Sequence, residues 1–187
     1  MIDIINFRFR ILVEAKVKVH YNDFLNHASH LSEVEFKKIY SHPALLTISN
    51  LKCLQAAKSV SKITRLNIFD QYLHTVPDEY QIYFIQNGIR LGRDASCEII
   101  FDNDEVSREH AKIKYLEIYG GNWVAIDCCS RNGTYVNNQR IRFIPHLLKD
   151  HDVIHLGKSV NLIFRTPEGL WKTISSHVRN ISEAILR

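Results

Sequence analysis

Hydrophobic and polar positions alternate along the start of the chain. From Phe7 to Tyr21 nearly every odd position is apolar, while Arg8, Arg10 and several later even positions are charged. Alternation with a period of two over this length predicts a half-buried strand. Further on, Ser32 stands three residues before Glu35, a capping box that predicts a helix over residues 33–40.

Two more helices are predicted in the same half. Pro43 suits the first turn of a helix. The apolar residues that recur after it at helical spacing are Leu45, Leu46, Ile48, Leu51, Leu54 and Val60. A short helix is expected over residues 68–73. All seven glycines fall from Gly88 to Gly169, and tight turns use the positive φ that glycine tolerates. The glycine-free part is therefore predicted to be mainly helical or long-stranded.

The second half has the pattern of many short strands. The strands are predicted over residues 80–85, 110–116, 123–126 and 159–165. Asn87-Gly88 is typical of a hairpin turn, and Gly120-Gly121-Asn122 predicts another turn. Short strands separated by regular turn signals favour a β-sandwich. After Pro167, apolar residues at helical spacing predict a C-terminal helix that packs on the protein rather than on a membrane.

Composition narrows the class of protein. The chain has 187 residues, of which 45% are hydrophobic, and no run of apolar residues is long enough to span a membrane. Charged residues interrupt the N-terminal apolar stretch, so no signal peptide is predicted. The four cysteines form no C-x-x-C pair, which favours reduced thiols in a cytoplasmic protein without a metal site.

Charge and motifs argue against two functional classes. The net charge of +4 is spread thinly along the chain, whereas nucleic-acid binders concentrate positive charge on one element. The chain has no phosphate-binding P-loop and no G-x-S-x-G, H-E-x-x-H or G-x-G-x-x-G motif. The missing motifs argue against catalysis, and we predict a protein that is not an enzyme and needs no cofactor.

Four motifs follow one another in the second half. They are Gly92-Arg93, Ser107-Arg108-Glu109-His110, the run from Ser130 to Asn137 (SRNGTYVN), and the run from Asp152 to Gly157 (DVIHLG). The first three place arginines, hydroxyls and an amide in loops between predicted strands. Loops at one end of a sandwich can converge on a binding edge. Arginine donates two parallel hydrogen bonds to a phosphate. This set is typical of a site for a phosphate ester carried on a partner.

The four motifs together resemble the forkhead-associated (FHA) domain, a phosphothreonine-binding β-sandwich. The resemblance covers about residues 80–166. It implies an all-β sandwich of two antiparallel sheets, joined to a mainly helical N-terminal segment (1–79) of unknown role and a C-terminal helix (167–187). Two positions depart from the family pattern. Asn138 and His151 stand where the family often has glycine, and neither touches the expected binding edge.

The resemblance also implies a role for each motif residue. Arg93 and Ser107 should bind the phosphate, Arg108 and Arg131 should add further contacts, and Asn132 should hold the peptide backbone. The residues expected to support the site are Gly92, His110, Gly133, Thr134 and Asn137. Gly92 is expected to let the chain turn beside the phosphate, His110 to brace the Ser107 loop, and Thr134 to brace the Asn132 loop.

The implied function is a phosphothreonine-dependent adaptor in Ser/Thr-kinase signalling, whose partner is a kinase or a kinase substrate. An alternative is a regulator whose N-terminal helices, over residues 43–73, bind nucleic acid. A further hypothesis is that the chain forms homo-oligomers. In them, Thr75, which lies three residues before Asp78, would be phosphorylated and bound by the FHA domain of a neighbouring chain.

Overall fold

A computed structural model describes residues 19–47 and 81–185, with side chains up to residue 176. The chain divides into two compact units. The described part of the first, which we call the helical unit, comprises residues 19–44, 81–84 and 166–185. The second, the sandwich unit, comprises residues 45–47 and 85–165. Each unit is described separately.

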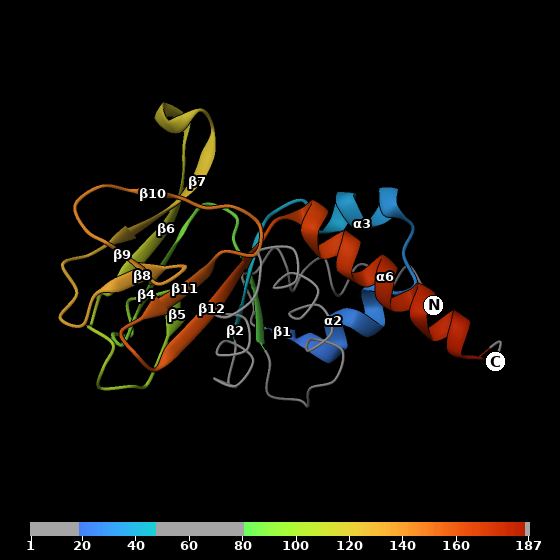
Figure 1. Cartoon of the computed structure of the whole chain (residues 1–187), viewed down its shortest axis with the longest axis horizontal. Helices are drawn as coiled ribbons and strands as arrows, with labels where there is room; N and C mark the ends of the chain where they lie inside the picture. The colour runs from blue at the N-terminus through green and yellow to red at the C-terminus, as the bar shows by residue number, and fades with distance from the viewer. Residues whose placement is uncertain (1–18, 48–80, 186–187) are drawn as a thin grey trace. The chain divides into compact units, whose positions relative to one another are not determined.

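The sandwich unit is built from two sheets (Figure 1). Within this unit, the strands of one sheet follow the order β2-β12-β11-β8-β9, and those of the other follow the order β10-β7-β6-β4-β5. The strands of the first sheet are β2 (Ala44–Thr47), β8 (Thr134–Val136), β9 (Gln139–Ile141), β11 (Val153–Leu156) and β12 (Val160–Arg165). Those of the second are β4 (Ile89–Gly92), β5 (Ile99–Ile100), β6 (Ala111–Leu116), β7 (Asn122–Asp127) and β10 (His146–Leu147).

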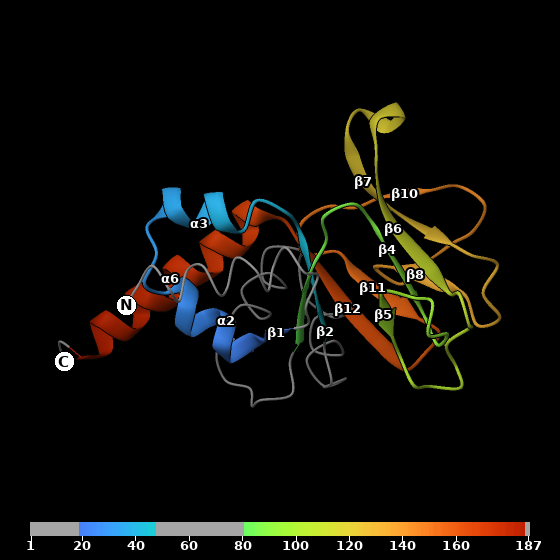
Figure 2. The ribbon, with the colours of Figure 1, turned by 180° about the vertical axis from the view of Figure 1, so that it is seen from behind.

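The core of the sandwich unit lies between these sheets. Leu91, Ile113, Ile154 and Leu162 are fully buried, two from each sheet. The predicted sandwich is confirmed, with the difference that β4 and β5 pair in parallel. The 3₁₀ turn η1 (Glu117–Tyr119) lies at the tip of the projecting β6–β7 hairpin in both views (Figures 1 and 2).

The helical unit contains α2 (Tyr21–Ala28), α3 (Glu33–Ile39) and α6 (Pro167–Ile185), together with the short antiparallel strands β1 (Val19–His20) and β3 (Gln81–Phe84). Its core is a cluster of aromatic rings. Phe24, Phe36, Tyr40, Phe84 and Trp171 lie within 4.8–6.4 Å of one another, centroid to centroid, in successive pairs. These rings come from segments that are far apart in the sequence.

Several predictions of elements are confirmed. Strands occupy the predicted positions at β3, β6, β7 and β12, and a helix begins at Pro167. Ser32 accepts a hydrogen bond from the Glu35 backbone and Glu35 accepts one from the Ser32 backbone, so the capping box is formed as predicted. No helix in the described ranges is long and apolar enough to cross a membrane.

The helix predicted from Pro43 is wrong in its described part. Residues 44–47 form β2, a neighbour of β12 in the sheet. Ala44, Leu45 and Leu46 are all fully buried. A short apolar run that is buried on every side does not reveal its secondary structure through its period. Residues 48–80, with the predicted helix over 68–73 and Thr75, lie outside the described residues.

Two further predictions are corrected. Of the strand predicted over residues 7–21, residues 7–18 lie outside the described part, Val19–His20 form β1, and Tyr21 already begins α2. Asn87-Gly88 does turn the chain, since Gly88 has a φ of 94°, but it makes no hairpin. β3 pairs with β1, whereas β4 pairs with β6 and β5.

Candidate phosphate-binding site

Three loops of the sandwich unit meet at one open pocket of about 650 Å³. One loop follows β4, the second joins β5 to β6, and the third joins β7 to β8. Arg93, Ser107, Arg108 and Arg131 line the pocket and come from these three loops. Asn132, the fifth predicted contact residue, does not line it. Asp94 and Glu109 also line the pocket, so three cations face two carboxylates there.

His110 joins the second loop to the third. It is fully buried, its Nδ1 accepts a hydrogen bond from the Ser107 backbone N–H at 3.1 Å, and its Nε2 lies 3.1 Å from the Gly133 carbonyl oxygen. Because Nδ1 accepts, the neutral ring carries its proton on Nε2 and donates it to Gly133. Burial lowers the pKa of His110, so the ring stays in this neutral form near neutral pH.

The hydroxyl of Ser107 is oriented by its neighbour across the pocket. Its Oγ accepts a hydrogen bond from the Arg131 backbone N–H at 3.0 Å. A serine hydroxyl has one proton and two acceptor lone pairs. With a lone pair engaged by Arg131, the proton is available to donate into the pocket.

Two of the arginines meet at Asp104. Arg93 Nη1 lies 3.3 Å from Asp104 Oδ1, and Arg131 Nη2 donates to the Asp104 backbone oxygen at 2.9 Å. The Asp104 side chain is 98% exposed, and exposed ion pairs contribute only about 0–1 kcal/mol. The carboxylate therefore holds Arg93 weakly, and a phosphate could displace it.

Gly92 is required for a close approach rather than for a turn. A Cβ at this position would lie 2.1 Å from the Arg108 carbonyl oxygen and 2.8 Å from Cys97 Sγ. Its φ is not in the left-handed region, which corrects the turning role expected from the sequence. The absence of a side chain lets β4 approach the backbone of the Ser107–Arg108 loop, which brings Arg93 to the pocket.

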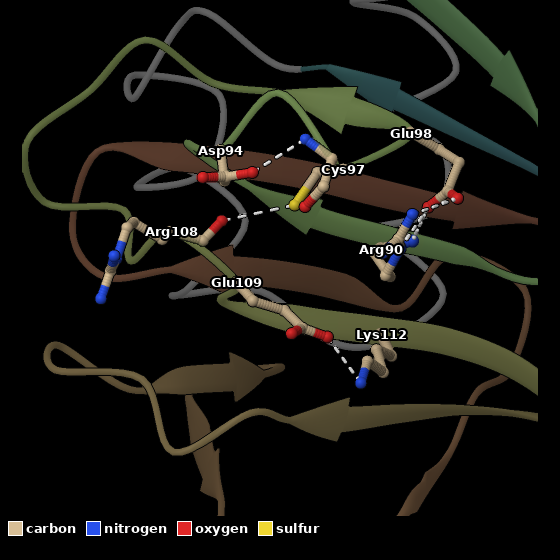
Figure 3. A network of polar contacts seen from close by, with 8 residues as sticks. Arg90, Asp94, Cys97, Glu98, Arg108, Glu109 and Lys112 are labelled. Atoms are coloured by element: carbon tan, nitrogen blue, oxygen red, sulfur yellow. Dashed lines mark hydrogen bonds and ion pairs between the residues drawn. The ribbon is translucent and has the colours of Figure 1, made fainter.

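Figure 3 shows how the neighbouring charges are arranged. The thiol of Cys97 donates to the Arg108 carbonyl at 3.3 Å, and the Arg108 side chain extends away from the strands. Glu98 binds Arg90 through both carboxylate oxygens, which holds the pKa of Glu98 down at about 2. Among the described residues no carboxylate lies within ion-pair distance of Arg108. Arg90 is therefore engaged in an ion pair with Glu98, whereas the guanidinium group of Arg108 is available to a ligand.

The third loop is held by Asp127, which the sequence did not single out. Its carboxylate accepts from the Ser130 hydroxyl at 2.5 Å and from the Thr134 hydroxyl at 2.6 Å. Thr134 therefore supports the loop through Asp127. Asn132 Nδ2 donates to the Glu105 carbonyl at 2.7 Å, which ties the third loop to the second. The signal for Asp127 was its position three residues before Ser130, a spacing typical of side-chain-to-backbone turns.

The two departures from the family pattern keep the required backbone. Asn138 has a φ of 68° and His151 a φ of 67°. Both therefore adopt the left-handed conformation that glycine would provide. Asn137 supports the far end of the sandwich, where its side chain donates to Asp152 at 2.7 Å and accepts from the Val153 backbone at 3.0 Å.

Comparison with protein families decides the nature of this unit. The model of the FHA domain matches residues 89–157, which include all four motifs. This region belongs to the FHA domain family. FHA domains are phosphopeptide-binding modules rather than enzymes.

Two known proteins are similar in sequence to part of this chain. The chain is 31% identical over 84 residues to the DNA damage response protein kinase DUN1 of Saccharomyces cerevisiae, covering 43% of this chain and 16% of that protein. It is 35% identical over 75 residues to the glycogen accumulation regulator GarA of Mycolicibacterium smegmatis, covering 40% of this chain and 44% of the regulator. The chain thus spans less than half the length of these relatives.

Among solved structures, one described as an analysis of phosphothreonine-dependent FHA domain interactions is 29% identical to this chain. It aligns with 46% of this chain and 83% of its own, at a TM-score of 0.40.

Proposed function

We propose that the FHA domain of this chain binds phosphothreonine in a partner protein and acts as an adaptor in Ser/Thr-kinase signalling. The observation that carries the proposal is that Arg93, Ser107, Arg108 and Arg131, from three separate loops, line one open pocket. A phosphate ester brings a charge of about −1.5 to −2 and three acceptor oxygens. Three guanidinium groups and one hydroxyl match that charge and those oxygens.

Each contact residue has a role in this arrangement. Arg93 exchanges the exposed Asp104 carboxylate for the phosphate, which has more charge and more acceptor oxygens. Ser107 donates the proton that its bond from Arg131 leaves available. Asn132, whose Nδ2 is engaged with Glu105, offers its Oδ1 to a backbone N–H of the bound segment. Arg108 and Arg131 contribute further charge at the rim.

The similar proteins support a role in signalling. One is named as a protein kinase and the other as a regulator, and we propose that the partner of this chain is likewise a kinase or a kinase substrate. The nucleic-acid alternative has no observation in its favour, because the helix on which it depended is a strand in its described part.

The test is binding of one peptide sequence in three forms: phosphothreonine, phosphoserine and unmodified threonine. We expect selective binding of the phosphothreonine form, weakened by added salt because the contacts are ionic. Arg93→Ala should lower the affinity at least about tenfold, since hydrogen bonds to charged groups contribute roughly 1.5–3 kcal/mol.

Lys114→Ala is the matched control, because it removes an exposed positive charge that does not line the pocket. It should leave the affinity within about twofold, the range typical of a surface substitution. Equal binding of the phosphorylated and unmodified peptides by the folded protein would overturn the proposal.

A further inference from the structure

Positive charge within the sandwich unit is concentrated on one segment, residues 128–149, which we call the basic segment. It contains no aspartate or glutamate, and its cations are Arg131, Arg140, Arg142 and Lys149. All the carboxylates of the unit lie before or after it in the sequence. A net charge of +4, as large as that of the whole chain, is therefore carried by β8, β9, β10 and the loops beside them.

The loop 142–145 of the basic segment joins β9, the end strand of one sheet, to β10, the end strand of the other (Figure 1). Phe143 in this loop is 92% exposed and Ile144 is 74% exposed. On either side of the loop, Ile141 and Leu148 are buried, and the ring of Pro145 restricts the backbone between them. The loop is therefore held near both ends while it presents two large apolar side chains to solvent.

The two arginines nearest this loop are available to a ligand. Within the described part of the chain, no carboxylate lies within ion-pair distance of Arg140 or Arg142. Asp127 lines a pocket together with both arginines, but its carboxylate accepts hydrogen bonds from the hydroxyls of Ser130 and Thr134. Exposed positive charge and exposed apolar surface therefore lie next to each other.

The loop 142–145 lies at the same end of the sandwich unit as the phosphate pocket. Ile141 pairs with Thr134, which follows the third loop of that pocket, and His146 pairs with Ala125 in β7, which precedes the third loop. Cys129 in the third loop lines both the phosphate pocket and the pocket of the two arginines. A surface bound by the loop 142–145 therefore lies beside the phosphate pocket.

An anionic membrane surface matches this combination of side chains. Its headgroups attract arginines, and the boundary between headgroups and acyl chains takes up apolar side chains. A single-stranded nucleic acid would satisfy the arginines and stack on Phe143, but it has no apolar layer to cover Ile144. Leu147, which is 43% exposed, and Lys149 continue the same composition along the segment. The observations therefore favour a lipid surface over a nucleic acid.

We propose that the basic segment docks the FHA domain on membranes that contain anionic lipids. Arg140 and Arg142 lie at the headgroups, and Phe143 and Ile144 enter the boundary layer beneath them. Docking in this orientation brings the phosphate pocket to the membrane surface, where a partner anchored in the same membrane is present at a high effective concentration. The docking itself does not depend on the proposed function, because none of these four residues lines the phosphate pocket.

The experiment measures sedimentation of the full chain with vesicles of phosphatidylcholine alone or mixed with phosphatidylserine. We expect binding to the mixed vesicles only, weakened by added salt. Arg140→Gln with Arg142→Gln should lower the partition coefficient about twentyfold, because each arginine near an anionic surface contributes about fivefold. Phe143→Ser with Ile144→Ser should lower it at least about tenfold, because less apolar surface leaves the water.

Matched variants outside the basic segment control for charge and for apolar surface. Lys38→Gln with Lys114→Gln removes two exposed positive charges. Val34→Ser with Ile118→Ser removes side chains that are 78% and 87% exposed. Both controls should keep the partition coefficient within about twofold, and all four double variants should unfold at nearly the urea concentration of the unaltered protein, since the altered side chains are exposed.

Two further arms identify what the basic segment binds. Arg93→Ala, in the phosphate pocket, should keep vesicle binding within about twofold, as expected for a residue outside the docking surface. A loss as large as that of the double arginine variant would place the lipid in the phosphate pocket and overturn the inference. Binding of a single-stranded RNA oligonucleotide in place of the vesicles, lost in the double arginine variant, would assign the segment to nucleic acid and overturn it too.

The remaining outcomes are equally decisive. Equal binding to vesicles without phosphatidylserine, no binding to either kind of vesicle, or binding that both loop variants retain would each overturn the inference. Binding of the phosphothreonine peptide in solution is measured separately. Failure of that peptide to bind overturns the proposed function and leaves the membrane inference standing, whereas failure of the vesicles to bind does the reverse.

Discussion

Each of the two units of this protein is stabilised internally by a different kind of interaction. In the sandwich unit, polar side chains hold the loops around the pocket, since His110 bridges the second and third loops and Asp127 fixes the third. In the helical unit, rings from α2, α3, β3 and α6 form one aromatic cluster around Phe24, Phe36 and Tyr40.

This difference follows from what each unit has to position. A binding site needs a few donors at defined places and angles, and hydrogen bonds are directional enough to provide that. Apolar packing is not directional and tolerates changes of sequence that conserve volume. The polar framework therefore belongs to the unit with the pocket, and substitutions in the two units should have different consequences.

The largest predicted effect is the loss of stability when the aromatic cluster of the helical unit is disrupted. Phe36 is fully buried and contacts the rings of Phe24, Tyr40 and Trp171. Phe36→Ala should lower the free energy of unfolding of the helical unit by about 3–5 kcal/mol, because it removes a large apolar side chain and leaves a cavity. The chain has two tryptophans, Trp123 in β7 and Trp171 in α6, so urea unfolding in a Trp123→Phe background reports on the helical unit.

The control for this variant lies on the same helix. Val34 is 78% exposed, so Val34→Ala should change the free energy of unfolding by less than about 0.5 kcal/mol. If the two variants unfold at the same urea concentration, the cluster does not stabilise the helical unit.

A smaller loss of stability, together with a loss of binding, is expected when the hydrogen bonds of His110 between the loops are removed. His110→Ala would leave the Ser107 backbone N–H and the Gly133 carbonyl oxygen without their partner. Each unsatisfied buried group costs about 1–3 kcal/mol, so we expect unfolding to be easier by about 2–4 kcal/mol, measured through Trp123 in a Trp171→Phe background.

Binding separates this variant from one that is only destabilised. At a temperature where the variant remains folded, its affinity for the phosphothreonine peptide should fall at least about tenfold, because the Ser107 loop is no longer held. His146→Ala, at a half-buried histidine of β10, should leave affinity and stability nearly unchanged. Full affinity of folded His110→Ala would show that the bridge between the loops does not position the site.

The smallest predicted effect is that the free energy of unfolding of both units depends on pH. Burial lowers the pKa of His27 in the helical unit and of His110 in the sandwich unit. Each ring is therefore easier to protonate in the unfolded chain, where its pKa is near 6.5. The stability of each unit should be complete above that pH and should decrease as the pH falls below it toward the lowered folded pKa.

The two tryptophan backgrounds measure this dependence for each unit. His27→Gln should flatten the pH profile of the Trp171 signal and leave that of the Trp123 signal unchanged. A decrease that persists in the Trp171 signal after this substitution would assign the dependence to another group.

Much of the sandwich unit could be predicted from the sequence, because its signals are local. Alternating runs such as 111–116 and turn glycines such as Gly120 depend on neighbouring residues alone. The family pattern also indicated which residues would gather at the loops, and four of the five line one pocket. Asp127 was missed because its partners, Ser130 and Thr134, become its partners only when the loop closes.

The helical unit was less predictable because its structure depends on contacts between segments that are far apart in the sequence. The helix α2 has no side-chain cap at His20 and follows an alternating run that favours a strand. Its buried residues Tyr21, Phe24, Leu25 and Ala28 do have helical spacing, but that spacing acquires its meaning from the rings of α3 and β3. The strand β2 was read as a helix because its run of buried apolar residues fits both structures.

Patterns of neighbouring residues were sufficient to predict the sandwich, the C-terminal helix and the capped helix α3, and they made the four motifs recognisable. The folded structure was needed to show that Gly92 serves a close approach and that Asp104 pairs with Arg93. These are contacts between atoms of different loops, and their distances follow from how the strands are ordered and paired. A one-dimensional pattern indicates which residues are able to meet, and the packing of the sheets decides which of them do.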